Sequence, residues 1–255
     1  MAVMDEFREE REAIKNAPLN KKMKYIWDYY KLQIIIAVVA SACIIAGIYY
    51  ASTNKTTVLN GIFLNCYTVD NEYTADNIEE EFLTEQKIDT DEYMVEFVTD
   101  LTYEMESDSF LAVDDNSTKQ TLAVYSSSKL LDFIAGSADD LTELAYKGYF
   151  VDLSEALSDE EYKMYEPYFL YLDMDVYEQR KEILDNGGDA SSIQIPDCTD
   201  KDSMKEPIPV LIDMNQSKKL TKAYNGSVDN VVLGIAGNSP NMENTRALIE
   251  YLLNN

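Results

Sequence analysis

One uninterrupted apolar run dominates the pattern of hydrophobic and polar positions along the chain. Residues 32–50, LQIIIAVVASACIIAGIYY, carry no charge, and Gln33 and Ser41 are the polar interruptions before the closing tyrosines. A helix of this length is about 28 Å long at ~1.5 Å per residue, close to the ~30 Å hydrocarbon core of a bilayer. The pattern therefore predicts a single transmembrane helix at 32–50.

The residues that flank this run predict its orientation. Lysines before the run indicate a cytoplasmic side, and aromatic residues at both ends are typical of the two membrane interfaces. The lysines are Lys21, Lys22, Lys24 and Lys31, and the aromatic residues are Trp27, Tyr29, Tyr30, Tyr49 and Tyr50. We therefore expect residues 1–31, which include a helix at 5–15, to form a cytoplasmic tail. The remaining chain is expected outside the cell membrane.

A cleaved signal peptide and a lipoprotein are the alternatives to a retained anchor. About 30 residues precede the run, which is more than the basic region of a signal peptide. The sequence Ala40-Ser41-Ala42-Cys43 resembles a bacterial lipobox, but Cys43 lies in the middle of the run with IIAGI after it. A retained single-pass anchor is the favoured interpretation.

After a polar spacer at 51–57, the pattern alternates between strands and helices as far as residue 255. The expected strands are 58–67, with a bulge at Gly61, 93–99, 130–135, a short 192–195, 207–214 and 231–236. The expected helices are 75–86, 117–128 after the cap-like Asp115-Asn116, 137–147 ended by Gly148, 159–165, 173–184, 217–224 and 242–254. Such alternation predicts an α/β domain with one mainly parallel sheet and helices on both of its faces.

Charge and composition exclude several classes of function. The chain carries a net charge of −26 and no histidine, and residues 1–31 contribute seven basic and six acidic side chains, so the acidic excess lies after the run. This field repels phosphate backbones, which argues against nucleic-acid binding. The lack of histidine removes His-based catalytic triads and His-ligated metals. No acidic pair has the spacing of a calcium loop, so we expect neither metal nor cofactor.

The cysteines and the tyrosines allow two interpretations each. Cys66 and Cys198 permit a disulfide outside the cell, but Cys66 at the end of an apolar strand also fits a buried thiol. Aromatic residues gather between 146 and 177. At helical spacing, Tyr162, Tyr165 and Phe169 fit a core-facing stripe, while a ligand platform or a protein-docking patch is the alternative.

Two segments of the domain carry a recognisable pattern, LLDFIAGSADDLTELAYKGYFVDLSEAL at 130–157 and VVLGIAGNSPNMENTRALIEYLL at 231–253. Together with residues 209–223, they resemble the extracellular solute-binding proteins of ABC transporters. The resemblance implies a domain at 58–255 similar to one lobe of a type II solute-binding protein, in a membrane-anchored form typical of Firmicutes, which are Gram-positive. Residues 154–206 are too few for a full second lobe, and we interpret them as an insertion or a rudimentary one.

The candidate ligand site lies where ligands of open α/β sheets bind, beyond the carboxyl ends of the strands and at helix N-termini. The residues expected there are Gly136, Ser137, Asp139 and Asp140, together with Asn65 and Asn238. The expected ligand is a sugar, peptide or amino acid.

No nucleophile elbow, P-loop or dinucleotide fingerprint occurs, so we expect a binding or sensing module and no enzyme. The alternative is an assembly scaffold that docks a membrane or envelope protein through its aromatic patch.

Overall fold

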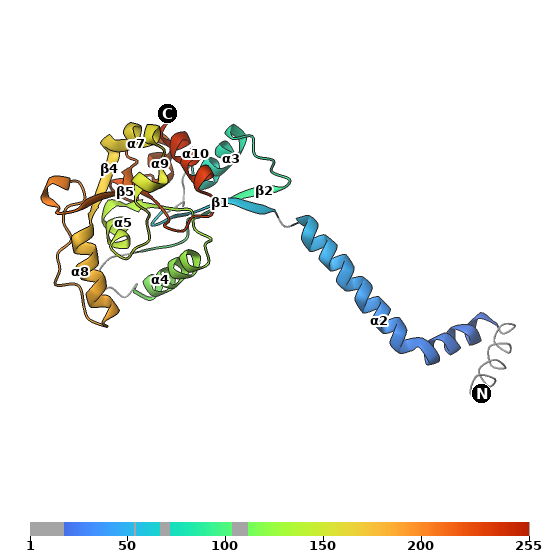
Figure 1. Ribbon diagram of the computed structural model, residues 1–255. Coiled ribbons are helices and arrows are strands. Elements are labelled where there is room, and N and C mark those ends of the chain that lie inside the picture. Colours follow the sequence, from blue (N-terminus) through green and yellow to red (C-terminus); the bar gives the residue numbers. More distant parts are fainter. Residues whose placement is uncertain (1–17, 54, 67–71, 104–111, 255) are drawn as a thin grey trace. The chain divides into compact units, whose positions relative to one another are not determined.

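The structure of the protein is a computed structural model that describes residues 18–53, 55–66, 72–103 and 112–254 (Figure 1). The chain divides into two compact units, Met1–Lys55 and Thr56–Asn255. The first unit contains one described helix, and the second contains the sheet and all the remaining elements.

In the first unit, α2 (Leu19–Thr53) is one continuous helix of 35 residues, so the beginning of the expected spacer is helical. Leu32, Ile45 and Trp27 on this helix are exposed. Within the residues that the structure describes, no helix is both long enough and apolar enough to cross a membrane. The span expected at 32–50 stays a prediction. The helix expected at 5–15, and the side chains of Tyr29, Tyr30, Tyr49 and Tyr50, lie outside the described residues.

The second unit is an α/β domain in which most expected elements are present. Its strands are β1 (Thr56–Phe63), β2 (Tyr93–Val98), β3 (Phe133–Ser137), β4 (Phe169–Asp173), β5 (Pro207–Asp213) and β6 (Val231–Ile235). Its helices are α3 (Ala75–Glu85), α4 (Ala112–Ser127), α5 (Ala138–Ala145), α6 (Leu153–Ala156), α7 (Asp159–Tyr165), α8 (Met174–Asp185), α9 (Lys218–Tyr224) and α10 (Met242–Leu253). Two 3₁₀ turns, η1 (Glu166–Tyr168) and η2 (Lys201–Ser203), complete the described elements.

The six described strands form one mixed sheet in the order β2-β1-β3-β6-β5-β4. The pairs β1–β2 and β1–β3 are parallel, whereas β3–β6, β6–β5 and β5–β4 are antiparallel. The prediction of a mainly parallel sheet is therefore wrong. Strands β1, β2, β3 and β5 end at one edge of the sheet, which we call the Ser137 edge. Strands β4 and β6 end at the opposite edge, which we call the cavity edge.

The short helix α9 explains why β6 does not run parallel to β5. Seven helical residues rise about 10 Å, whereas the seven residues of β5 extend about 23 Å, so α9 cannot carry the chain back along the full strand. The chain instead turns at Asn225 and Gly226, both with positive φ. It re-enters the sheet beside the end of β5, where the Met214 N–H donates to the Val231 carbonyl at 2.9 Å.

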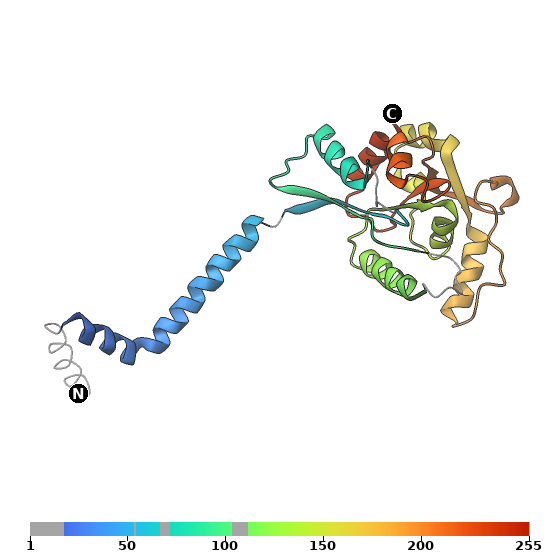
Figure 2. The same cartoon turned by 180° about the vertical axis from the view of Figure 1, so that it is seen from behind.

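Helices cover both faces of the sheet, as the sequence predicts. Helices α3, α7, α9 and α10 lie on one face, and α4, α5 and α8 lie on the other (Figures 1 and 2). Side chains alternate accordingly along the strands, because neighbouring residues in a strand point to opposite faces. Two core clusters result: the first core lies between the sheet and α3, α9 and α10, and the second core lies between the sheet and α4 and α5. Phe133 packs into the first core and Ile134 into the second. Residues 154–206 supply α7, α8 and β4, and β4 belongs to this same sheet.

Four local expectations differ from the structure. Strand β4 is absent from the expected elements, because the pattern assigns Phe169 to a core-facing stripe at helical spacing; it lies instead in β4, after the break at Pro167. Residues 192–195 continue from a turn into irregular chain in place of a strand. Helix α4 begins at Ala112, so Asp115-Asn116 lies inside it. The β1 bulge falls between Thr57 and Leu59. Gly61 is needed for another reason, since a Cβ there would lie 2.0 Å from the Phe133 ring.

Asp132, directly before β3, ties three parts of the domain together. Its side chain is fully buried. One carboxylate oxygen accepts from the Asn60 backbone at 2.8 Å and from Asn241 Nδ2 at 3.1 Å. The other accepts from Ser239 Oγ at 2.6 Å and from the Asn241 backbone at 3.1 Å. One side chain therefore links β1, β3 and the turn that leads into α10.

Candidate functional site

At the Ser137 edge, the structure brings three of the expected ligand residues together. Asn65 follows β1, Ser137 ends β3 and caps α5, and Asp140 lies in the first turn of α5. Ser137 Oγ accepts from the Asp140 backbone at 3.1 Å and donates to Asp140 Oδ2 at 2.6 Å. The predicted helix cap at Ser137 is therefore confirmed.

These polar groups bind one another. Asn65 Nδ2 donates to Asp140 Oδ2 at 3.0 Å and to the Tyr103 carbonyl at 2.7 Å, and Asn65 Oδ1 accepts from the Tyr103 backbone at 2.9 Å. Gly136 is covered, because a Cβ there would lie 2.7 Å from Leu141 and 3.3 Å from Leu64. Asp139 is exposed. This arrangement holds the segment at Tyr103 against α5 and gives the edge a structural role.

Asn238 does not join this group. It follows β6, and because β6 runs antiparallel to β3, its carboxyl end lies at the cavity edge. There the Asn238 side chain donates to the Ser126 carbonyl at the end of α4. The placement of Asn238 with Ser137 is therefore wrong, and the error follows directly from the assumption of parallel strands.

Among the described residues, the cysteines form no disulfide, and the tyrosine-rich segment packs largely into the core. Cys66 and Cys198 are free thiols. Cys66 is buried, and burial raises the pKa of its thiol to about 11, which makes it a poor nucleophile. The aromatic residues between 146 and 177 divide between the two faces. Tyr165 and Phe169 pack in the first core, and Tyr146, with its neighbours Tyr149 and Phe150, packs in the second.

A cavity of about 410 Å³ opens at the cavity edge, between the end of α5, the start of α6, helix α8, and strands β4 and β5. Its floor is apolar and includes Phe150, Leu172, Ile208 and Val210. Its polar lining includes the carboxylates Asp152, Glu155 and Glu206. A cavity of a few hundred Å³ that combines apolar side chains with a few placed polar groups is typical of small-molecule sites.

The turn after α5 shapes one side of the cavity. Gly148 adopts a φ of +80°, a conformation that L side chains rarely adopt, and it lies against the Tyr177 hydroxyl. The chain then returns to the sheet, where Phe150 pairs with Ala236 and the Val151 N–H donates to the Ile235 carbonyl at 3.1 Å. This turn brings Phe150 and Asp152 to the cavity.

Buried Asp173 positions the other side. It caps α8 by accepting from the Asp175 backbone at 3.1 Å. The same carboxylate accepts from the backbones of Lys205 at 3.0 Å and Glu206 at 3.2 Å. The Asp173 N–H donates to the Tyr146 hydroxyl at 3.0 Å. The segment that carries Glu206 is therefore fixed against the end of β4.

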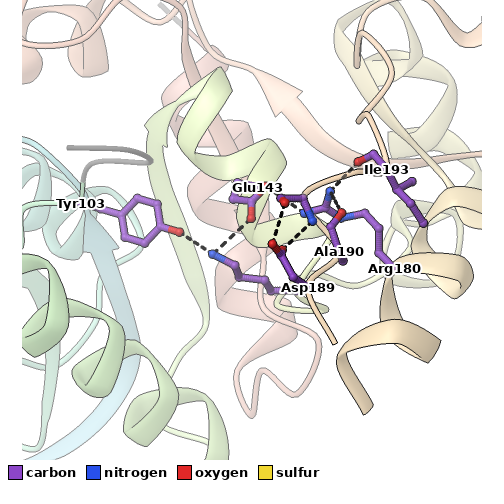
Figure 3. Close-up of polar contacts among 8 residues, drawn as sticks. Tyr103, Glu143, Arg180, Asp189, Ala190 and Ile193 are labelled. Carbon is purple, nitrogen blue, oxygen red and sulfur yellow. Dashed lines mark hydrogen bonds and ion pairs between the residues drawn. The ribbon is translucent and has the colours of Figure 1, made fainter. Parts of the chain in front are cut away.

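A chain of charged contacts joins α5 to α8 near this side (Figure 3). Arg180 on α8 donates to the carbonyls of Ala190 at 3.2 Å and Ile193 at 2.8 Å, and pairs with Glu143 on α5 at 3.6 Å. Glu143 also pairs with Lys147 at 3.3 Å, and Lys147 donates to the Tyr103 hydroxyl at 2.9 Å. This network holds the loop after α8 and pairs both Arg180 and Lys147 with Glu143.

The cavity was not expected from the sequence. It depends on β4, which the pattern did not reveal, and on the direction of β6. One local signal is the Gly148 to Asp152 turn, which the sequence predicts as the end of a helix and a return of the chain, without indicating a cavity. Among the described residues, no group of three or more acidic or cysteine side chains is placed to hold a metal ion.

Comparisons with known family models, with characterised proteins and with solved structures give no significant match to this chain.

Proposed function

We propose that the protein is a non-catalytic, membrane-anchored binding module whose extracytoplasmic domain takes a small molecule in the cavity beside β4, α5 and α8. The cavity is the main support for this proposal, because it combines apolar side chains with a small set of polar groups, as small-molecule sites do. The sequence similarity at 130–157 and 231–253 to solute-binding proteins of ABC transporters supports the same class of function.

The anchor is proposed from the sequence and the exposure of α2. Residues 32–50 carry no charge, and four lysines precede them. The described apolar side chains of this segment are exposed, among them Leu32, Ile36 and Ile45. Exposed apolar side chains on a continuous helix favour a lipid environment. We propose a single-pass orientation with residues 1–31 in the cytoplasm.

A binding screen with a cavity-filling variant tests the proposed module. The full chain, reconstituted in zwitterionic nanodiscs, is heated with sugars, amino acids, short peptides and organic amines, and unfolding is followed by tyrosine fluorescence. We expect at least one class to raise the midpoint. Ala145 lines the cavity at the end of α5, so Ala145→Phe should abolish that shift. Ala138→Phe, at the other end of the same helix, should retain it.

Two results would contradict this function. One is the absence of any shift across the screen, and the other is an equal shift in the Ala145→Phe variant. The orientation is tested separately by protease treatment of intact cells, where protection of the domain from external protease would contradict an extracytoplasmic location.

A further inference from the structure

We propose that the cavity selects an organic cation, that is, an ammonium or guanidinium head on an apolar body. This inference rests on the proposed function and adds the chemical class of the ligand. Three observations support it: the acidic side chains that line the cavity, its apolar floor, and the ion pairs that the neighbouring cations already make.

The charged groups that line the cavity are all acidic. Asp152, Glu155 and Glu206 contribute carboxylates, and neither lysine nor arginine contributes to the lining. Glu155 and Glu206 are exposed at the cavity. Carboxylates at the mouth of an apolar cavity attract cations and repel anions, and the net charge of −26 adds to this field.

The cations near the cavity have other partners. Lys205 precedes Glu206 in the chain, but its ammonium pairs with Asp175 at 2.7 Å. Arg180 and Lys147 both pair with Glu143. Within the described residues, no lysine or arginine forms an ion pair with any of the three lining carboxylates. The three carboxylates therefore leave uncompensated negative charge at the cavity, which a cationic ligand would complement.

The floor distinguishes an organic cation from a metal ion. Phe150, Leu172, Ile208 and Val210 offer no oxygen ligands from their side chains, whereas calcium and magnesium require six or more oxygen ligands including water. An apolar body gains free energy when it leaves water for such a floor. The ring of Tyr177 lines the same cavity, but the Lys181 ammonium lies 5.9 Å from its centroid, so the chain already places a cation on this ring. A charged head and an apolar body together match both parts of the site.

The test uses three probes that share one body and differ in charge. They are phenethylamine, which is a cation at pH 7, 2-phenylethanol, which is neutral, and phenylacetate, which is an anion. Their Kd values are measured by ligand-observed NMR on the full chain in zwitterionic nanodiscs, with empty nanodiscs as the blank. We expect the cation to bind at least tenfold more tightly than the alcohol, which corresponds to about 1.4 kcal/mol. The anion should not bind.

Variants locate the selectivity. Glu155→Gln and Glu206→Gln together should weaken binding of the amine about tenfold and leave binding of the alcohol unchanged. Glu178→Gln, at an exposed position on α8 outside the cavity lining, is the matched control and should change neither. Ala145→Phe should remove binding of both probes. Raising the salt concentration should weaken the amine more than the alcohol.

The possible failures are distinguishable. If the alcohol binds as tightly as the amine, or if the double variant leaves the amine unaffected, the cation inference is wrong. In that case, loss of binding in Ala145→Phe would still support a ligand cavity. If none of the three probes binds, the cation inference is also wrong, and the broader screen alone decides the proposed function.

Discussion

Replacing Asp132 with asparagine should destabilise the domain far more than its similar shape suggests. Each carboxylate oxygen of Asp132 accepts two hydrogen bonds, from the Asn60 and Asn241 backbones, Asn241 Nδ2 and Ser239 Oγ. Asparagine keeps one oxygen and places an NH₂ group against the other two donors. Two hydrogen bonds to a charged group are lost, at about 1.5–3 kcal/mol each. The expected loss is therefore about 3–6 kcal/mol.

This loss is a large part of the ~5–15 kcal/mol that stabilises a typical domain. Urea unfolding of the full chain, followed by far-UV circular dichroism, measures it. Asp229→Asn, at an exposed position, is the matched control and should change stability by less than about 0.5 kcal/mol. Ser239→Ala removes a single donor to this carboxylate and should cost about 1.5–3 kcal/mol. That variant keeps the test informative if Asp132→Asn does not fold.

A loss below about 1 kcal/mol in Asp132→Asn would refute the reasoning. It would mean that the buried carboxylate is replaceable by any side chain of its size, and that the links among β1, β3 and the start of α10 contribute little. An equal loss in Asp229→Asn would also refute it, because the effect would then follow from net charge.

Three further changes test other parts of the structure. Gly148→Ala should lower the free energy of unfolding in urea by about 1–2 kcal/mol, because φ is +80° and the new Cβ would lie 2.9 Å from the Tyr177 hydroxyl. An unchanged unfolding midpoint would contradict this left-handed turn at Gly148. Ser137→Ala should cost about 1 kcal/mol by removing the cap on the Asp140 N–H, and no loss would argue against that cap. Burial, aided by nearby carboxylates, raises the pKa of Glu79 from 4.5 to about 7, so the folded state binds this proton more tightly than the unfolded state. The contribution of Glu79 protonation to the stability of the fold is fully present below about pH 4.5 and is lost as the pH rises through 7. Glu79→Gln should reduce the fall in the free energy of unfolding measured between pH 4.5 and 8. An unaltered fall would exclude Glu79 as its source.

Elements with local signals could be predicted from the sequence. Helix α7 begins and ends where the pattern placed it, because Ser158 and Glu161 form a capping box and Pro167 follows. The cap at Ser137 and the stop at Gly148 are equally local. A side chain that satisfies a helix end a few residues away acts within one turn, so the sequence contains the whole cause.

Strand direction and the cavity depend on distant residues. The direction of β6 depends on how far α9 reaches compared with β5. The position of Glu206 depends on Asp173, 33 residues earlier in the chain. Asn238 was placed with Ser137 because both follow strands, and the two lie at opposite edges because those strands are antiparallel. No short window of sequence contains these relations.

The position of Trp27 has a practical consequence. It is the single tryptophan of the chain and lies exposed on α2, whereas most of the nineteen tyrosines belong to the domain. The two units therefore carry different intrinsic fluorophores. Indole emission reports the surroundings of the helix alone, and phenol emission reports mainly on the folded domain. Transfer of α2 between water and lipid, and occupation of the cavity, can thus be followed in one unlabelled sample at two wavelengths.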